Sequence, residues 1–470
     1  MVGAVLPAPA ARPRPILNAA VVLEGGHIAH VQAKTLLPTY DVFDEARYFA
    51  PATERTLWRF RGLKVGLAIC EDVWSGAFWG EPQPYAIDPV ADLVRQGAEL
   101  VVAISASPFE QRKIQLREAM IGDAARRHRV SFVFCNLVGG NDELVFDGAS
   151  FAVAPSGAIG PRLARFAEDF ACVDPFAPAV APASPLESDV ELLERALVLG
   201  ISGYLHKQSF ERVVIGLSGG IDSSVTAHLA VEALGARNVL GLLMPGPFSS
   251  GHSVSDAEAL AANLGIEART VPIDAIFGEF IERFRDLFGP RDDYGLTQEN
   301  LQARVRGTLL MAVSNLENRI VLATGNKSEL SVGYTTLYGD LVGGVAVIGD
   351  VLKRDVYALA RHANGAGERI PWHTIEKPPS AELRPGQLDQ DSLPPYDVLD
   401  EILCQILERG VRPEQVAAPG IDAATVRWVA QALDRAEYKR RQAPVVLRVS
   451  RKAFGSGRRV PIAQRSGWGL

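Results

Sequence analysis

VVIGLSGGIDSS, at residues 213–224, is the stretch of sequence that decides the fold of this 470-residue chain. Apolar residues dominate its first part and predict a buried strand from Val213 to Leu217. The residues from Ser223 to Leu234 predict a helix, and a loop of serine, glycine and aspartate joins the two. A strand that passes through such a loop into a helix indicates a unit of a parallel α/β sheet.

The alternation of strand and helix continues along the chain. Further strands are expected at 239–244, 271–273 and 320–324, and further helices at 255–264 and 301–316. This order predicts a doubly wound parallel sheet with right-handed crossovers. Ligands bind at the carboxyl ends of the strands in such sheets, so we expect the functional loops to follow Leu217, Met244 and Thr324.

The loop after the first of these strands has the chemistry of a phosphate-binding site. Its glycines let backbone N–H groups approach a phosphate, its serines add donors, and the helix N-terminus adds positive potential. Asp222 would repel phosphate directly, so we expect it to hold Mg²⁺ between the phosphates. A glycine-rich turn that only caps the helix is the alternative, which the strand–loop–helix context disfavours. The residues predicted to contact ATP here are Gly216, Leu217, Ser218, Gly219, Gly220, Ile221, Asp222, Ser223 and Ser224.

The loop resembles the pyrophosphate-binding loop of the N-type ATP pyrophosphatases, which adenylate a substrate and release pyrophosphate. The loop alone leaves the substrate open, because GMP synthetases, asparagine synthetases and tRNA-thiolating enzymes carry similar loops. Three further segments narrow the choice. They are TQENLQARVRG at 297–307, LATGNKSELSVGYTTLYGD at 322–340, and KPPSAELRPGQ at 377–387 with DQDSLPPY at 389–396.

Together with the loop, these segments resemble the glutamine-dependent NAD synthetases over nearly all of residues 190 to 460. The resemblance implies that ATP activates the carboxylate of deamido-NAD as an adenylate, and that ammonia then displaces AMP to give NAD. It also implies an adenine-nucleotide α-hydrolase-like sheet, Mg²⁺ and at least a homodimer. The residues that it implies are Thr324 and Lys353 for ATP, Asn300, Arg304, Glu329, Ser380 and Lys439 for deamido-NAD, and Asp222 and Glu329 for the metal.

The N-terminal half carries a cysteine at the end of an apolar run. KVGLAICEDVW at 64–74 predicts a strand that ends at Ile69 and is followed directly by Cys70. Such a cysteine is more often part of a core, but CEDVW resembles the nucleophile turn of nitrilase-type amidases, and Lys34 resembles their catalytic lysine. In that role the Cys70 thiolate would attack the amide of glutamine, form a thioester and release ammonia. The same resemblance implies that glutamine is bound by Tyr40, Glu71, Ser107 and Lys113.

The resemblance to these amidases is incomplete near the N-terminus. Their triad contains a glutamate well upstream of the lysine, whereas the only acid before Lys34 is Glu24, in the pattern of a turn after a strand. We therefore expect a truncated nitrilase-like αββα sandwich without its general base. A misassigned start or a fragment is the favoured reason, and a genuinely shortened protein is the alternative. On this expectation the complete protein takes ammonia from glutamine, while the 470-residue chain uses ammonia and uses glutamine poorly.

Composition sets outer limits on function. The net charge of −7 gives no reason to expect nucleic-acid binding, and no apolar run is long enough to span a membrane. Four cysteines without a CxxC pair favour a reduced, cytoplasmic protein. Closely spaced prolines predict a linker. We expect a partial glutamine amidohydrolase domain at 1–175, a Pro-rich linker at 176–190 and an NAD synthetase domain at 191–470.

Two alternatives stand beside the leading hypothesis. The chain could be another adenylating amidotransferase such as a GMP synthetase, against which KPPSAELRPGQ argues. It could also be a non-catalytic remnant that only binds nucleotide or a partner chain, against which Asp222, Glu329 and Lys353 argue. The Lys- and Arg-rich stretch 439–459 is either a solvated tail or a site for an anionic substrate.

Overall fold

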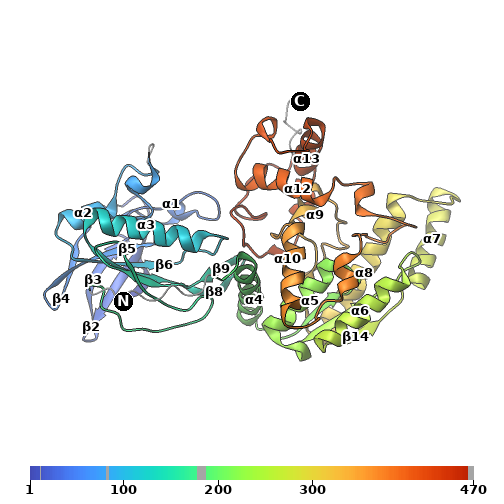
Figure 1. The fold of residues 1–470 in the computed structure, drawn as a ribbon, viewed down its shortest axis with the longest axis horizontal. Helices are drawn as coiled ribbons and strands as arrows, with labels where there is room; N and C mark the ends of the chain where they lie inside the picture. Colours follow the sequence, from blue (N-terminus) through green and yellow to red (C-terminus); the bar gives the residue numbers. More distant parts are fainter. Residues whose placement is uncertain (11, 81–83, 177–186, 464–470) are drawn as a thin grey trace. The chain divides into compact units, whose positions relative to one another are not determined.

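The computed structural model describes residues 1–470 except residue 11 and residues 81–83, 177–186 and 464–470. The chain divides into two units (Figure 1). The first consists of Met1–Gly139 and Val145–Glu187, and the second of Gly140–Leu144 and Ser188–Leu470. Most of the predicted linker at 176–190 therefore lies outside the described residues.

The first unit is built on two β-sheets. The smaller is antiparallel with strand order β1-β2-β3. The larger has the order β11-β10-β7-β6-β5-β4, in which β5, β6 and β7 are parallel neighbours and β4 and β10 pair antiparallel at either side. Two short strands, β8 and β9, form a separate pair, and their residues from Gly140 to Leu144 are counted with the second unit. The strands are β1 (Val2–Pro7), β2 (Ile16–Glu24), β3 (His27–Ala33), β4 (Leu57–Phe60), β5 (Leu63–Ile69), β6 (Leu100–Ser105), β7 (Ser131–Asn136), β8 (Val138–Asn141), β9 (Leu144–Asp147), β10 (Phe151–Val153) and β11 (Ile159–Arg162).

Both faces of the larger sheet are covered, which explains why β5 has no polar residue from Val65 to Ile69. Val65 and Leu67 point to one side and pack with Ala20 of the smaller sheet. Ala68 points to the other side, where helices α2 (Pro89–Arg95) and α3 (Lys113–His128) contribute residues such as Met120 to a second cluster. A layer of helices and two stacked sheets result, in keeping with the predicted truncated αββα sandwich, and β5 delivers Cys70 at its carboxyl end.

Several apolar side chains of the smaller sheet are exposed. Val5 is 62% exposed and Ile28 59% exposed, and Val2 and Leu23 are exposed beside them. The short helix α1 (Glu45–Tyr48) follows this sheet in the chain.

The second unit contains a six-stranded parallel sheet with strand order β14-β13-β12-β15-β16-β17. The chain starts at β12, moves outward to β14, and then returns to the other side of β12 with β15. The order therefore reverses between β12 and β15, and the crevice at such a reversal is where ligands bind. The strands are β12 (Val213–Gly216), β13 (Val239–Leu243), β14 (Glu267–Thr270), β15 (Ile320–Ala323), β16 (Val345–Ala346) and β17 (Val445–Val446).

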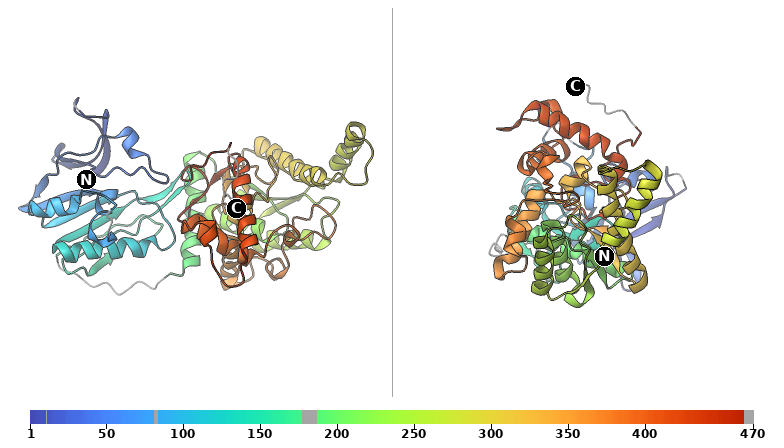
Figure 2. Two further views of the ribbon diagram at one scale, coloured as in Figure 1. Left: turned by 90° about the horizontal axis from the view of Figure 1, so that it is seen from above. Right: turned by 90° about the vertical axis from the view of Figure 1, so that its right-hand side faces the viewer.

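Helices cover both faces of this sheet (Figures 1 and 2). On one face, Val214, Leu240 and Leu242 pack with Leu301 and Leu310 of α8, and side chains of α7 complete the cluster. On the other, α5 packs on β12 and β13 and is flanked by α4, α6 and α10. The helices of this unit are α4 (Asp189–Lys207), α5 (Ile221–Leu234), α6 (Gly251–Leu264), α7 (Asp274–Phe288), α8 (Leu296–Glu317), α9 (Lys327–Val332), α10 (Lys353–Ala363), α11 (Trp372–Glu376), α12 (Tyr396–Leu403), α13 (Ala423–Arg435) and α14 (Glu437–Arg440).

One predicted strand is wrong. The third strand is β14 at Glu267–Thr270, and residues 271–273 follow it instead of forming it. β14 lies at the edge of the sheet and its side chains are largely exposed, so it lacks the apolar run by which the buried strands are recognised. The helix predicted at 255–264 begins earlier, at Gly251, because the Ser250 side chain caps it by accepting the N–H of Ser253.

The basic stretch 439–459 is not a solvated tail. The buried Arg440 guanidinium donates to the carbonyls of Leu330, Ser331 and Leu433, and Glu437 pairs with both Arg440 and Arg458. Among the described residues, no helix is at once long and apolar enough to cross a bilayer.

Candidate active sites

The loop between β12 and α5 is folded as a phosphate cradle. Gly219 has a φ of +74°, and a Cβ at this position would lie 2.1 Å from the carbonyl oxygen of Ser253, so only glycine fits. Hydroxyl groups hold the loop from within, since the Oγ atoms of Ser223 and Ser224 donate to the Gly220 carbonyl at 3.0 and 2.9 Å. The first N–H groups of α5, which have no partner within the helix, therefore follow a loop that is already held in shape.

A cavity of about 450 Å³ opens beside this loop. Its apolar part is formed by Leu217, Met244, Leu310 and Val342, next to the end of β15. The predicted site residues that line it are Gly216, Leu217, Ser218, Gly220, Ile221, Asp222, Ser223, Thr324, Glu329, Lys353 and Ser380. Most of the predicted ATP residues are therefore gathered in one cavity, although they come from three separate segments of the chain.

A buried lysine joins the two carboxylates predicted to hold metal. The Nζ of Lys353 lies 2.6 Å from Asp222 Oδ2 and 3.3 Å from Glu329 Oε1, and its side chain is only 1% exposed. Burial, with the charge of Asp222, raises the pKa of Glu329, while the two carboxylates raise the pKa of Lys353. The carboxylates are 19% and 15% exposed, so they remain open to the cavity.

These carboxylates suit a magnesium ion as part of a larger ligand set. Mg²⁺ prefers carboxylate and phosphate oxygens and usually keeps several waters. In the part of the chain that the structure describes, no group of three or more His, Cys, Asp or Glu side chains is placed to hold a metal. Asp222 and Glu329 thus fit an ion that takes its other ligands from ATP and water, and Asn326 steadies Asp222 by donating to its Oδ1 at 2.9 Å.

Three residues predicted to bind the dinucleotide lie outside the described cavity lining. Asn300 Oδ1 accepts the Thr336 hydroxyl at 2.7 Å, and the Arg304 guanidinium donates to the Leu337 carbonyl. Lys439 Nζ donates to the carbonyls of Gly333 and Thr335 at 2.7 and 2.6 Å. All three hold residues 333–337, of which Tyr334 and Thr335 line the cavity.

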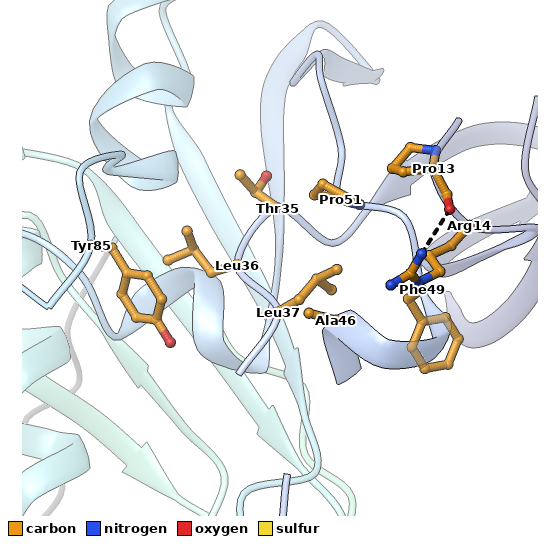
Figure 3. Close-up of a pocket in the computed structure, with 9 residues that line it drawn as sticks. All are labelled: Pro13, Arg14, Thr35, Leu36, Leu37, Ala46, Phe49, Pro51 and Tyr85. Carbon is orange, nitrogen blue, oxygen red and sulfur yellow. Dashed lines mark hydrogen bonds between the residues drawn. The ribbon is translucent and has the colours of Figure 1, made fainter. Parts of the chain in front are cut away.

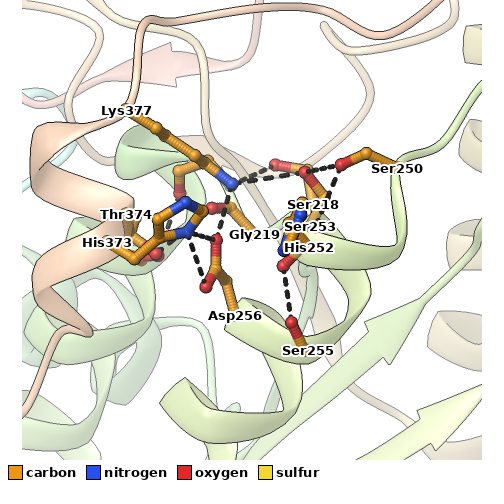
Figure 4. A network of polar contacts seen from close by, with 12 residues as sticks. Ser218, Gly219, Ser250, His252, Ser253, Ser255, Asp256, His373, Thr374 and Lys377 are labelled. Carbon is orange, nitrogen blue, oxygen red and sulfur yellow. Dashed lines mark hydrogen bonds and ion pairs between the residues drawn. The ribbon is translucent and has the colours of Figure 1, made fainter.

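Several residues of the cavity lining, and Asp256, which contacts them from outside the described lining, were not predicted. Asp256 accepts His373 Nδ1 and Lys377 Nζ, each at 2.8 Å (Figure 4), and Thr374 of the same segment donates to the Gly219 carbonyl. The only sequence signal for this group was the position of Lys377 at the start of KPPSAELRPGQ. Other unpredicted residues of the lining are Arg306, Tyr334, Glu382 and Asp389.

In the first unit, Cys70 occupies a strained turn. It is the first residue after β5 and has a φ of +45°, which is uncommon for a side chain other than glycine. Asp72, two residues on, accepts the backbone N–H groups of Thr35, Leu36 and Ile69 at 3.0, 2.8 and 3.1 Å. These bonds fasten the segment that carries Lys34 to the Cys70 turn. Burial raises the pKa of Asp72 to about 6 against the opposing effect of its hydrogen bonds.

Lys34 has a carboxylate partner that the sequence analysis missed. Its Nζ lies 2.6 Å from Glu45 Oε1 and its side chain is 1% exposed. Glu45 follows Lys34 in the chain, whereas only the preceding residues were searched for an acid. The pair lies close to the Cys70 turn, because Thr35 and Leu36, which follow Lys34, donate to Asp72.

The four residues predicted to bind glutamine differ in their surroundings. Glu71 accepts the hydroxyls of Tyr40 and the unpredicted Tyr85 at 2.9 and 2.6 Å. Burial of the two tyrosines, together with the charge of Glu71, raises the pKa of both. Lys113 lies 5.5 Å from the centre of the Trp74 ring, which follows in the same turn. Ser107 is buried and its N–H donates to the Asn136 side chain. A cavity of about 320 Å³ in this unit is lined by Thr35, Leu36 and Tyr85 among others, but not by Cys70 (Figure 3).

Comparison with known proteins identifies both units. The NAD synthase family matches residues 193–443, and the carbon–nitrogen hydrolase family matches residues 2–174. Glutamine-dependent NAD(+) synthetases of Synechocystis sp. and Thermotoga maritima are 49% and 42% identical to this chain, over 95% of it and over 81% and 83% of their own lengths. A solved structure of the glutamine-dependent NAD+ synthetase of Acinetobacter baumannii, in complex with adenosine diphosphate, is 36% identical, with a TM-score of 0.74 over 98% of this chain and 83% of that one.

Proposed function

Because this chain belongs to the family of glutamine-dependent NAD(+) synthetases, its activity is the ATP-dependent amidation of deamido-NAD, and we propose that the 450 Å³ cavity of the second unit performs it. The observation that carries the proposal is the meeting of three features in one cavity. They are the phosphate loop, the cluster of Lys353 with two carboxylates, and the apolar slot beside Thr324. Family membership also sets aside a GMP synthetase.

The cavity orders the substrates along its length. We assign adenosine to the apolar slot and the phosphates to the loop, so that the α-phosphate faces the remaining space, where the nicotinate carboxylate enters. An oxygen of that carboxylate attacks the α-phosphorus, the bond to the β-phosphate breaks, and pyrophosphate leaves. Ammonia then attacks the carbonyl carbon of the adenylate, and AMP leaves as the amide forms. The loop N–H groups and Lys353 hold the charge that develops, and the walls orient the reactants.

Asp222 and Glu329 are the residues that would hold Mg²⁺. Bound there with ATP, the ion would neutralise phosphate charge next to the reacting phosphorus. Asn300, Arg304 and Lys439 are assigned to deamido-NAD through the segment 333–337 that they hold, with Ser380 on the opposite wall. We further propose a cytoplasmic protein that is at least a homodimer. Its four free cysteines and the exposed Phe280 and Leu287 of α7 agree with these two assignments.

We assign the ammonia-producing reaction to the first unit. Cys70 is the nucleophile, because it is held at the end of β5 in a strained turn. The Lys34–Glu45 pair is the proton-handling group beside it, and Glu71 with Tyr40 presents a carboxylate and hydroxyl suited to the α-amino group of glutamine.

The direct test is product analysis with purified chain. With ATP, Mg²⁺, deamido-NAD and ammonium, we expect one pyrophosphate and one AMP for each NAD formed, and no pyrophosphate when deamido-NAD is left out. Xanthosine monophosphate in place of deamido-NAD serves as the negative control. Absence of pyrophosphate in the complete mixture would support a remnant that only binds nucleotide. Replacing ammonium by glutamine then measures the first unit separately.

A further inference from the structure

The segment Lys377–Asp389, which we call the proline-rich segment, forms one wall of the nucleotide cavity. Residues 377–383 and Asp389 all line it. The segment leaves α11 at the phosphate loop, where Thr374 contacts Gly219, and it carries Ser380 across the cavity. The cavity is therefore lined by both this segment and the phosphate loop.

The wall is fastened by polar contacts more than by apolar burial. Pro378, Ala381 and Leu388 are exposed, so they contribute little buried apolar surface. Segments with few buried apolar contacts open locally at low free-energy cost. The contacts that keep this wall in place must therefore be polar ones.

Two charged side chains fasten the segment to the first turns of α6. Lys377 donates to Asp256 at 2.8 Å and to the Ser253 hydroxyl at 3.2 Å (Figure 4). Glu382 accepts the Ser250 hydroxyl and the Ser253 hydroxyl, each at 2.8 Å, and the Ser250 N–H at 3.1 Å. The contact between Glu382 and Ser253 spans 129 residues of sequence, so it fixes the segment to a distant element.

The Glu382 contact also determines where Ser380 lies. The Ser380 hydroxyl accepts the N–H of Glu382 at 3.1 Å and donates to the Gln387 carbonyl at 2.5 Å. Glu382 itself has a φ of +51°, a conformation that costs free energy for any residue with a side chain. That conformation persists because three donors hold its carboxylate.

We propose that Glu382 is a positioning residue of the amidation reaction, which latches the proline-rich segment onto α6 and so retains ATP in the cavity. The inference rests on the proposed assignment of ATP to this cavity. The carboxylate acts through Ser250 and Ser253, not on the reacting atoms. Its loss opens the wall, speeds the release of nucleotide and leaves the phosphate loop intact.

The variants E382Q and E382A test the latch, with R384Q as the matched control. Arg384 belongs to the same segment but pairs with Asp391 at the surface, where both side chains are 45% exposed. Three hydrogen bonds to a carboxylate are weakened in E382Q, and we expect about a 10- to 100-fold faster dissociation of a non-hydrolysable ATP analogue, from the strength of charged hydrogen bonds. The KM for ATP rises in step, and the KM for deamido-NAD rises as well, because Ser380, which we assign to that substrate, loses the position that Glu382 gives it.

Backbone hydrogen exchange of residues 380–388 separates positioning from loss of folding. We expect faster exchange there in E382Q and E382A, with unchanged exchange in α5 and α8 and an unchanged melting temperature. The double variant S253A/E382A should release the analogue no faster than E382A, since both act through one contact.

The possible outcomes distinguish failure of the proposed latch from failure of the assignment of ATP to this cavity. If wild-type chain does not bind the analogue, the assignment of ATP to this cavity fails. If wild type binds it and E382Q releases it at the wild-type rate, the latch is refuted while the assignment stands. Equal acceleration in R384Q would also overturn the proposal, because the effect would then not belong to Glu382.

Discussion

Replacement of Lys353 by methionine is the sharpest test of the nucleotide cavity. The lysine is buried between Asp222 and Glu329, and methionine has a similar length without the charge. Removing one partner of a buried ion pair costs about 3–5 kcal/mol, because the remaining charge has no compensation. A domain of 150–250 residues loses about 2–4 °C of melting temperature per kcal/mol, so K353M should melt about 6–20 °C lower.

The same change removes a preorganised charge from the reaction. Loss of one such donor typically lowers kcat by about 10²- to 10³-fold, and we expect that loss in K353M, assayed well below its melting temperature. The variant K353R, which keeps the charge, should retain more of both properties. Because two carboxylates would face each other without a cation, Mg²⁺ should raise the melting temperature of K353M more than that of wild type.

Lys327 provides a matched control for stability. It is also 1% exposed and lies 3.0 Å from Asp350 and 2.8 Å from Glu408, but it does not line the described cavity. K327M should therefore melt lower by a similar amount, while its folded fraction keeps its turnover. Wild-type turnover in K353M, or an equal loss of turnover in K327M, would refute the role assigned to Lys353.

Three further outcomes follow from single positions. G219A should lose nucleotide binding and stability, because its Cβ would meet the Ser253 carbonyl, whereas G235A, with a φ of +78° and nothing within 4 Å, should cost only about 1–2 kcal/mol of backbone strain in thermal unfolding. C70A should abolish any NAD synthesis that glutamine supports and leave synthesis from ammonium unchanged, as measured with the two nitrogen sources in parallel. Burial raises the pKa of Asp400 to about 6, so the folded state binds more protons than the unfolded state between about pH 4 and 6, and the free energy of unfolding falls as pH rises through that range. D400N should remove a fall of about 3 kcal/mol, measured by denaturant titrations at several pH values. An unchanged dependence of the free energy of unfolding on pH would contradict this assignment.

The sequence predicts features that are local or strongly apolar. β5 and β12 are buried strands that their apolar runs make recognisable in the sequence. The loop after β12 has a composition that few purely structural turns share. The strand β14 was misplaced because it is an exposed edge strand with no such run. A pattern based on burial cannot find a strand that is not buried.

Pairings between distant residues are what the sequence could not predict. Glu45 was missed as the partner of Lys34 because the search for an acid followed the chain order of a known triad. Glu382 was quoted within a motif, yet its role depends on Ser250, 132 residues away, and no spacing rule links the two. Residue types indicate the chemistry that a site can perform, but only the folded structure shows which side chains contact one another.

The two buried lysines of the second unit show why such a contact has to be examined atom by atom. Each lysine faces two carboxylates, so a cluster carries one surplus negative charge when both of its carboxylates are ionised. In the Lys327 cluster, Asp350 is fully satisfied, since it also accepts the N–H groups of Val449 and Ser450 and the Ser450 hydroxyl. In the Lys353 cluster, Asp222 accepts only from Lys353 and Asn326 in the described chain and remains open to the cavity. A carboxylate with unused lone pairs, a surplus charge and access to a phosphate loop can take up a cation together with its ligand, whereas one enclosed by backbone donors can only hold the fold together.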